Sequence, residues 1–419
     1  MRDWVERRLA DCAEILDSQR IPVSGELRSA EPGATPYYGA NGLQGYIHGY
    51  IFDEPLILIA EDGGYFEDFE TRPIAYRIFG KSWVNNHAHV LRPKAGVEFD
   101  FLFYSLEHKN IVSFIKGGTR AKLNQAELRD IKIAFPPHKE AQQRIAAILA
   151  SIDTAIEKTE ALIAKHQQIK AGLMHDLFTR GVLPNGQLRP KESLVLTPLG
   201  RLPDSWRLGS ILELTDPLRQ PILTGPFGAD LGSSDFVDEG VPVLRIGNVQ
   251  QGFLDLSNLL HVSDQKASTL ARYRIQTGDL LFARQGATTG RNALADDRAN
   301  GSLINYHIIR VALDKERCAP LFVEAAFASD VVKRQIERDK GRGTREGINT
   351  AQLTSLEFPI APVDEQRRIA ELLSRQNKVI ATTQHHQETL QKQKHGLMQD
   401  LLTGHVPVPA APEPAEAAA

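Results

Sequence analysis

One segment has the spacing of a nucleotide-binding loop. Residues 75–82 end in Gly-Lys-Ser and fit a relaxed phosphate-loop pattern. Such a loop works because small residues let backbone N–H groups wrap a phosphate ahead of a helix. Here the loop positions hold Tyr, Arg, Ile and Phe, and Trp-Val-Asn-Asn follows. We therefore expect no nucleotide site in this segment.

Two further fragments imitate catalytic sites. Glu107 and Lys109 form the Glu-x-Lys half of a nuclease motif with Asp100 upstream, but they fall on an amphipathic helical pattern where such groups are usually solvated. His87 and His89 alternate along one strand, and no carboxylate or cysteine completes a metal-ligand set with them. The sequence also has no glycine-rich cofactor loop after a strand and no Asp/Asn-Pro-Pro-aromatic methyltransferase motif. The sequence predicts a chain without catalytic residues, cofactor or metal of its own.

Reading of DNA fits the polar residues better. Arg pairs bidentately with guanine, and Asn or Gln with adenine, so loops on a β-rich frame that carry these side chains are candidates for base contacts. The candidates are Tyr38, Asn41, Lys81, Asn85, Asn86 and His87 in the first half, and Arg245, Asn248, Arg284, Gln285, Thr288 and Arg291 in the second. Each of them could equally be an ordinary surface or turn residue.

Basic residues in two Gly/Thr loops are candidates for phosphate contacts. These are Arg120, Lys122, Arg342 and Arg345, and the run 340–345 is basic although the chain has a net charge of −3. The alternative is a solvated charged loop.

The chain contains an internal repeat. Gln-Gln-Arg-Ile-Ala at 142–146 leads to Gly-Leu-Met-His-Asp-Leu at 172–177, and Gln-Arg-Arg-Ile-Ala at 366–370 leads to Gly-Leu-Met-Gln-Asp-Leu at 396–401, with an offset of 224 positions throughout. A Gly-Thr-Arg lead-in recurs at 118–120 and 343–345, at an offset of 225. A period of half a chain indicates two similar halves and not a solenoid.

Each repeat predicts one long helix with a narrow apolar stripe. The stripe has two positions in seven, as in a coiled coil, and its apolar members are Ile145, Leu149, Ile152 and Ile156 in the first helix and Ile369, Leu373, Ile380, Leu397 and Leu401 in the second. We expect an antiparallel pair of helices about 55 Å long, at ~1.5 Å per residue. Two unrelated surface helices are the alternative, which the shared register disfavours.

The remaining segments contain β-rich runs broken by turn residues, which predicts an α+β fold with two globular domains separated by the two helices. The expected order is a first domain at 1–138, a long helix at 139–180, a linker at 181–205, a second domain at 206–362, a second long helix at 363–404 and a disordered tail at 405–419.

Composition indicates a soluble intracellular protein. The 419 residues are 42% hydrophobic and 24% charged, the N-terminus lacks an apolar signal segment, and no run approaches the ~18 apolar residues of a membrane helix. The only cysteines, Cys12 and Cys318, have no metal-ligand spacing, which suits a reducing cytoplasm.

These features together resemble the DNA-specificity subunit of type I restriction–modification systems, and the resemblance covers nearly the whole chain. The family's helix-start signature of Pro, a short spacer, Glu-Gln and Ile-Ala is carried by 362–370. Residues 36–42, 83–91, 278–281 and 286–290 add segments common in its recognition domains. In the first repeat Ala141 separates Glu140 from Gln142, so we expect a frayed or shifted helix start there.

The resemblance implies a non-catalytic subunit in which each domain recognises one half of a bipartite DNA target and the helix pair sets the gap. It implies two methyltransferase subunits as partners, which would direct adenine methylation, and restriction/translocase subunits for cleavage. S-adenosylmethionine, ATP and Mg²⁺ would then belong to the partners. The alternatives are a coiled-coil scaffold without sequence-specific DNA binding, and the specificity subunit of a methylation-only or fused-type system. A self-contained nuclease or methyltransferase is a further rival.

Overall fold

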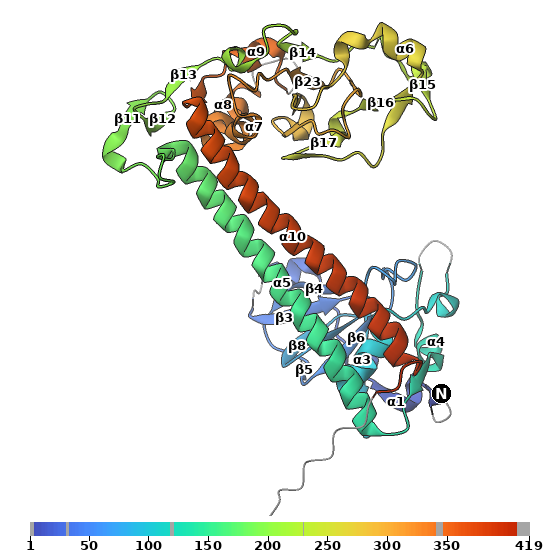
Figure 1. Cartoon of the computed structure of the whole chain (residues 1–419). Coiled ribbons are helices and arrows are strands. Elements are labelled where there is room, and N and C mark those ends of the chain that lie inside the picture. Colours follow the sequence, from blue (N-terminus) through green and yellow to red (C-terminus); the bar gives the residue numbers. More distant parts are fainter. Residues whose placement is uncertain (1–3, 31–32, 118–120, 229, 341–346, 409–419) are drawn as a thin grey trace, which may run out of the picture. The chain divides into compact units, whose positions relative to one another are not determined.

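The structure is a computed structural model that describes residues 4–30, 33–117, 121–228, 230–340 and 347–408. The chain divides into two compact units, one formed by residues 1–161 and 384–419 and the other by residues 162–383. Each unit therefore combines a sheet-rich domain with parts of both long helices, α5 (Lys139–Arg180) and α10 (Val363–Leu402), as Figure 1 shows.

Unit 1 contains two four-stranded sheets. The first has the strand order β2-β9-β6-β7 and the second β4-β3-β8-β5, in which β3 and β8 run parallel. Their bounds are β2 (Ala13–Ile15), β3 (Thr35–Gly39), β4 (Gly42–Ile47), β5 (Phe52–Asp53), β6 (Leu56–Ala60), β7 (Ala75–Ile78), β8 (Lys81–Val84) and β9 (Ala88–Pro93). All five residues of β6 are buried, as an uninterrupted apolar run predicts. The unit also contains α1 (Leu9–Cys12), α2 (Gly25–Ala30), α3 (Phe99–Glu107) and α4 (Gln125–Asp130).

Unit 2 repeats this plan. Its sheets have the orders β14-β23-β20-β21 and β15-β19-β16-β22, and β16 runs parallel to β22. Their bounds are β14 (Ile222–Thr224), β15 (Phe236–Val237), β16 (Val241–Leu244), β19 (Leu260–Val262), β20 (Leu280–Ala283), β21 (Asn292–Leu294), β22 (Leu303–Ile304) and β23 (Ile308–Val311). Its further elements are β17 (Val249–Gln250), β18 (Phe253–Leu254), α6 (Asp264–Thr269), α7 (Pro320–Ala328), α8 (Asp330–Lys340) and α9 (Thr350–Ser355). The first sheets of the two units thus share their strand order, whereas the second sheets share a three-stranded core and differ in the fourth strand, which is β5 beside β8 in unit 1 and β15 beside β19 in unit 2.

A two-stranded antiparallel ladder closes each domain before its long helix begins. In unit 1 it joins β1 (Val5–Arg8) to β10 (Lys132–Phe135), and in unit 2 it joins β13 (Arg207–Gly209) to β24 (Phe358–Ile360). The segment that enters each domain is therefore hydrogen-bonded to the segment that leaves it.

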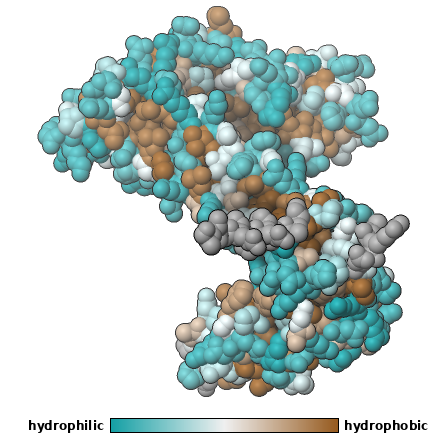
Figure 2. Space-filling model, turned by 60° about the horizontal axis from the view of Figure 1, so that its bottom comes forward, coloured by the Kyte–Doolittle hydropathy of each residue, from teal (hydrophilic) through white to brown (hydrophobic). Residues whose placement is uncertain are grey.

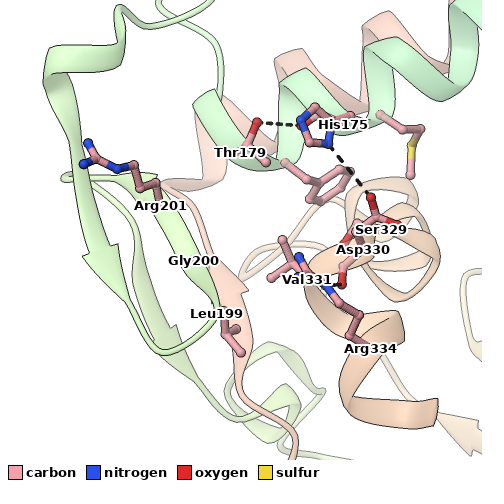
Figure 3. Close-up of a pocket in the computed structure, with 11 residues that line it drawn as sticks. His175, Thr179, Leu199, Gly200, Arg201, Ser329, Asp330, Val331 and Arg334 are labelled. Atoms are coloured by element: carbon pink, nitrogen blue, oxygen red, sulfur yellow. Dashed lines mark hydrogen bonds and ion pairs between the residues drawn. The ribbon is translucent and has the colours of Figure 1, made fainter. Parts of the chain in front are cut away.

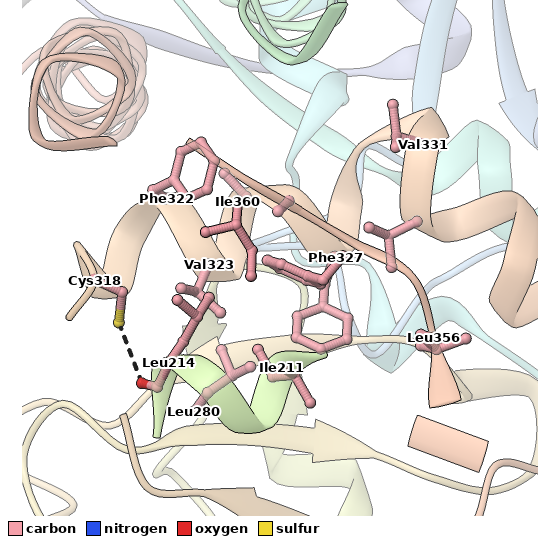
Figure 4. Packing of buried hydrophobic residues seen from close by; sticks show 14 of the residues in the cluster. Ile211, Leu214, Leu280, Cys318, Phe322, Val323, Phe327, Val331, Leu356 and Ile360 are labelled. Carbon is pink, nitrogen blue, oxygen red and sulfur yellow. Dashed lines mark hydrogen bonds between the residues drawn. The ribbon is translucent and has the colours of Figure 1, made fainter. Parts of the chain in front are cut away.

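The ends of the long helices are built into the domain cores. Ile145 and Leu149 of α5 share a buried cluster with Leu401 of α10 in unit 1, while Leu177 of α5 shares one with Ile369 of α10 in unit 2. The paired segments are therefore antiparallel within each unit. The stripe was expected to cover only the partner helix, but at these ends it also packs against a domain, and Figure 4 shows part of the unit 2 core.

The remaining residues of the two apolar stripes are buried to different degrees. Ile152 and Leu373 are buried, whereas Ile156, Ile380 and Leu397 are partly exposed. Polar side chains also join α10 to α5. The Gln376 side chain donates to the His166 carbonyl at 3.0 Å, and the Gln387 side chain donates to Glu160 at 2.8 Å.

A buried glutamine fixes the start of each long helix. The Oε1 atom of Gln142 accepts from the Glu98 N–H at 2.9 Å, at the start of α3. Gln366, 224 positions later, accepts from the Ala319 N–H at 3.0 Å, at the start of α7. Each glutamine satisfies a backbone donor that a helix start leaves without an intrahelical partner.

The start of α5 is shifted by one residue relative to its lead-in, as expected, because α5 begins two residues after Pro137 whereas α10 begins directly after Pro362. Helix α5 begins at Lys139 and α10 at Val363, so both begin in the same register of the repeat. The inserted Ala141 occupies the position of Glu365, and Glu140 is left exposed. What differs between the copies is therefore the ion pair that Glu365 makes.

Glu365 is 1% exposed and holds the segment expected to be a linker. One carboxylate oxygen accepts from the Val182 N–H at 2.8 Å, and the carboxylate also takes two hydrogen bonds from Arg189, of which the one to Oε2 is 2.9 Å. The hairpin of β11 (Leu194–Thr197) and β12 (Gly200–Pro203) follows, so residues 181–205 are folded onto unit 2.

Unit 1 also has a buried ion-pair cluster, which forms around Lys394 near the end of α10. Lys394 contacts Glu107 and Asp153 at 2.8 Å each, and Asp153 accepts from the Tyr104 hydroxyl at 2.7 Å. The expectation that Glu107 is solvated is therefore wrong, because α10 returns a lysine over it. Burial is the main cause that raises the pKa of Tyr104, and the neighbouring Asp153 carboxylate raises it further. The Tyr104 hydroxyl therefore stays protonated and donates.

The surface is mixed. Hydrophilic and hydrophobic areas are intermingled over the face shown in Figure 2. Within the described part of the chain, none of the helices combines the length and apolar character needed to cross a bilayer.

We predict that Glu365→Ala lowers the stability of unit 2 by about 3–5 kcal/mol, because it leaves the Arg189 charge and the Val182 N–H unpaired. Calorimetry of the full chain measures this as a lower unfolding temperature. Glu140→Ala, at the exposed glutamate of the first repeat, is the matched control and should change the unfolding temperature little. Equal effects of the two substitutions would contradict the anchoring role.

We also predict a pH dependence from Glu324 in unit 2. Burial raises the pKa of this carboxyl above its usual 4.5. The hydrogen bond that it accepts from the Leu294 N–H and the nearby Lys170 charge both oppose this rise. A raised folded-state pKa adds stability that is complete below pH 4.5 and is lost as pH rises through the folded pKa. Glu324→Gln should therefore flatten the dependence of the unfolding temperature on pH above 4.5, whereas an unchanged profile would refute this assignment.

Candidate nucleic-acid interface

In the first domain, an Asn-x-His loop joins β8 to β9. The Asn85 N–H donates to the Tyr38 carbonyl at 3.0 Å, which extends the parallel β3–β8 pairing by one residue. The buried Asn85 side chain accepts from the His87 N–H at 2.8 Å and donates to Gln44 at 3.1 Å. Asn85 thus holds the loop in shape and positions His87.

The second domain has the same loop between β22 and β23. The Asn305 N–H donates to the Leu244 carbonyl at 3.0 Å, and the Asn305 side chain accepts from the His307 N–H at 3.1 Å. The candidates chosen from the sequence omit this loop. Its signal was present, because Asn-x-His occurs at 85–87 and at 305–307, but its offset of 220 differs from that of the helices.

A second loop lies against each histidine. The Glu61 N–H donates to the His87 carbonyl at 2.8 Å, and the Arg284 N–H donates to the His307 carbonyl at 3.1 Å. The next residue then meets the ring: Asp62 lies 2.8 Å from Nδ1 of His87, and Gln285 lies 2.8 Å from Nδ1 of His307. Two loops that come from different strands are therefore joined in the same way in both domains.

The other candidates of the first domain differ in exposure. Lys81 is exposed, with its ammonium 4.7 Å from the centre of the Tyr50 ring, and Asn86 is exposed. Asn41 donates to the Gly63 carbonyl at 2.9 Å, and Lys122 lies 3.1 Å from Glu61. Tyr38 is partly buried against Tyr76.

In the second domain, Arg245 and Arg291 are exposed, and Arg291 donates to the Gln250 side chain at 2.8 Å. Asn248 is buried and donates to the Asp255 carbonyl at 2.8 Å, which favours a structural role. Thr288 donates to the Gln285 carbonyl at 3.3 Å.

Arg284 is half-buried, and its guanidinium donates to the carbonyls of Ile348 and Tyr306, both at 3.3 Å. Burial lowers the pKa of Arg284. These bonds tie the loop after β20 to the Asn-x-His loop. The phosphate candidates Arg120, Arg342 and Arg345 lie outside the described residues.

Aromatic rings adjoin the second loop. The Tyr306 ring centre lies 3.6 Å from that of His307 and 6.0 Å from that of Phe227. Phe227 is exposed, so the loop presents apolar ring surface beside its polar groups. Flat aromatic faces of this kind suit contacts with nucleic-acid bases or sugars.

Carboxylates do approach His89, contrary to expectation, because they come from distant parts of the sequence. Asp17, Glu61 and His89 bring their ligand atoms within 4.8 Å of one another. The group is already paired internally, since Nδ1 of His89 lies 2.6 Å from Asp17, Nε2 lies 2.8 Å from the Leu123 carbonyl, and Arg20 lies 2.6 Å from Glu61.

For Asp17, burial raises the pKa, but hydrogen bonding and attraction from His89 outweigh burial, so the net shift is downward. This ionised group fits a structural ion network that fixes the base of the Asn-x-His loop.

The segment 75–82 also has a structural explanation. It comprises β7, the turn at residues 79–80 and the first two residues of β8, and Gly80 in the turn has φ +65°, a conformation that favours glycine. A phosphate loop must lead directly into a helix, whereas this segment leads into strands β8 and β9.

A pocket lies at the end of α5 in unit 2 (Figure 3), between α5, β12 and α8. Met174 and Phe178 contribute apolar surface, and His175 lies 3.9 Å from Asp330 with side chains 63% and 71% exposed. In unit 1 the residues 224 positions later, Met398 and Leu402 among them, line a pocket at the end of α10. Each repeat therefore has a matched hollow at the end of its long helix.

Comparison with known proteins agrees with the duplicated architecture. The chain is 24% identical to the type I restriction enzyme MjaVIII specificity subunit of Methanocaldococcus jannaschii, over 97% of this chain and 93% of the relative. It is 28% identical to the putative MjaX specificity subunit of the same organism, over 82% and 83%. A putative specificity subunit of Haemophilus influenzae is 38% identical, but the match covers only 36% of this chain and 37% of the relative.

Solved structures share the fold. The S subunit of a type I restriction–modification system from M. genitalium matches with a TM-score of 0.59 over 96% of both chains, at 14% identity. A chain from work on the assembly and conformational transition of the type I R-M system matches with a TM-score of 0.55, over 97% of this chain and 99% of that one, at 15% identity.

The family model for the type I restriction modification DNA specificity domain matches twice, over residues 1–166 and 231–392. These ranges include most of each domain together with part of the long helix that follows it. The chain therefore belongs to the type I restriction modification DNA specificity family.

Proposed function

We propose that this chain is the DNA-specificity subunit of a type I restriction–modification complex, in which each sheet-rich domain recognises one half of a bipartite target. The observation that carries the proposal is the matched pair of loop assemblies around His87 and His307. Both are built from the same backbone hydrogen bonds on equivalent strands. Two readers of one construction, with different exposed side chains, suit a target of two unlike half-sites.

The long helices would set the gap between the half-sites. Each is anchored at its start by a buried glutamine and enters the cores of both units, so it can transmit a fixed spacing. A separation of roughly one DNA turn, ~34 Å, is compatible with helices of this length.

Catalysis would reside in partners. We propose two methyltransferase subunits, which carry S-adenosylmethionine and methylate adenine, and restriction/translocase subunits that use ATP and Mg²⁺. The matched pockets at the ends of α5 and α10 support two copies of one partner, because an internal repeat offers the same surface twice. This chain would act as the non-catalytic, cytoplasmic specificity component.

We predict that replacing residues 1–138 by those of a relative changes one half of the methylated target and leaves the other half and the gap unchanged. Replacing residues 206–362 is the reciprocal control and should change the other half. Methylation mapping of DNA modified by the chain with its methyltransferase reports both. A scaffold without sequence-specific binding would leave the target unchanged in both exchanges, and activity of the purified chain alone would indicate an enzyme instead.

We also predict that seven residues inserted into each long helix, after Ala161 and before Gln384, widen the gap by about three base pairs. Seven residues add ~10 Å and keep the seam facing the partner helix. The half-sites should remain the same in the methylation map. The same seven residues inserted after Pro407, beyond α10, should leave the gap unaltered. An unaltered gap after the helix insertions would refute the spacing role.

A further inference from the structure

The matched histidines present their rings in a defined orientation. Asp62 approaches His87 through a carboxylate oxygen and Gln285 approaches His307 through Oε1, so in both domains an acceptor faces Nδ1. Nδ1 therefore carries a proton, and Nε2 is the atom left for an outside partner. Among the described residues, neither Nε2 atom has a hydrogen-bond partner.

Both histidine rings are accessible to solvent, although the backbone of each residue is held in place. The His87 side chain is 39% exposed and His307 is partly exposed, while the backbone of each is fixed on two sides by the Asn-x-His loop and the neighbouring strand end. A side chain on such a rigid support can be read as a directed contact.

The location favours DNA. Asp62 forms a β-bridge with Lys122, and Gln285 forms one with Gly347. Lys122 and Gly347 lie two residues after the repeated Gly-Thr-Arg segments, which carry the candidate phosphate-binding arginines. Each histidine thus lies beside residues adjacent in sequence to the candidate backbone contacts of its own half-site.

The protonation of His307 decides between a base and a phosphate. Burial, together with the Arg284 charge, lowers the pKa of His307, so the ring is neutral near pH 7. A neutral ring with Nδ1–H engaged offers only an acceptor at Nε2. Phosphate oxygens are acceptors as well, whereas adenine N6 and cytosine N4 donate in the major groove.

We propose that His87 and His307 are specificity-determining residues, one for each half-site, and that each contacts a base edge through Nε2, which in His307 accepts a hydrogen bond from an exocyclic amino group of adenine or cytosine. This inference rests on the proposed DNA-reading function and assigns it to two atoms. Asp62 and Gln285 act as positioning residues that set the orientation of each ring. Their difference, a carboxylate in one half and an amide in the other, makes the two readers chemically unequal.

The substitutions that test the proposal separate the two ring nitrogens. In His307→Asn the side-chain amide can donate in place of Nδ1, but nothing replaces Nε2. In His307→Gln the longer amide brings an oxygen acceptor toward the position of Nε2. The same pair is made at His87. His385→Asn on the exposed face of α10 is the matched control, since its side chain is 80% exposed and lies outside both domains.

The measurement is methylation by the full complex on a panel of duplexes in which each base pair of the mapped target is changed in turn. We expect wild type to lose about tenfold at one base pair per half-site, which bears the amino group in the half-site read by His307, and each Asn variant to lose that discrimination at its own half-site only. The Gln variant should recover part of it. At the half-site read by His307, a duplex carrying the same base without its amino group should behave as the changed base pair does.

Several outcomes would overturn the inference. Equal weakening on every duplex by an Asn variant, with a shallower salt dependence, would assign that histidine to phosphate. An unaltered panel in the Asn variants would show that the rings do not contact DNA, while a mapped wild-type target would still support the proposed function. If the wild-type complex methylated no bipartite target, the proposed function itself would be refuted. Unfolding temperatures of all variants separate these results from misfolding.

Discussion

Everything in this chain depends on how a long, mostly polar helix is attached to a globular domain. The attachment is a buried side-chain amide: Gln142 and Gln366 each accept from a backbone N–H at the start of a short helix. An amide is neutral, so its burial avoids the large desolvation cost of a charge, and its hydrogen bond satisfies a donor that the domain leaves open. Apolar residues of the following turns then enter the core.

Around that shared attachment the two halves differ in charge. Unit 2 buries Glu365 against Arg189, whereas unit 1 has Ala141 at the same position and places its buried ion pairs at Lys394 instead. Asp153, which receives Lys394, is matched by Asn377 in the second half. Buried charges are costly when unpaired, so each helix end fits the domain it meets in the chain better than the other. The repeat is thus close in backbone and distinct in electrostatics.

The sequence predicts the helices and their register well, because the repeated apolar positions report a local period that packing only reinforces. It also predicts buried strands such as β6, where an unbroken apolar run has few alternatives. It does not predict which polar residues face inward. Asn85 and Glu107 look like surface groups in sequence, yet their partners come from segments far along the chain.

For the same reason the pairing of His87 with Asp62 cannot be predicted from spacing alone. The second histidine escaped notice because insertions between strands shift its offset relative to the helices.

Met398 and Leu401 belong to the core of unit 1, whose other members come from the first 161 residues. The first domain to leave the ribosome is therefore not the first that can complete its core. It must wait for about 240 further residues, from Ala161 to Leu401, during which unit 2 is synthesised and can fold. Until α10 arrives, the apolar face of α5 near Ile145 lacks its cover. The order of synthesis and the order of folding are thus reversed at the two ends of the chain, and any event that shortens the C-terminal helix damages the N-terminal domain.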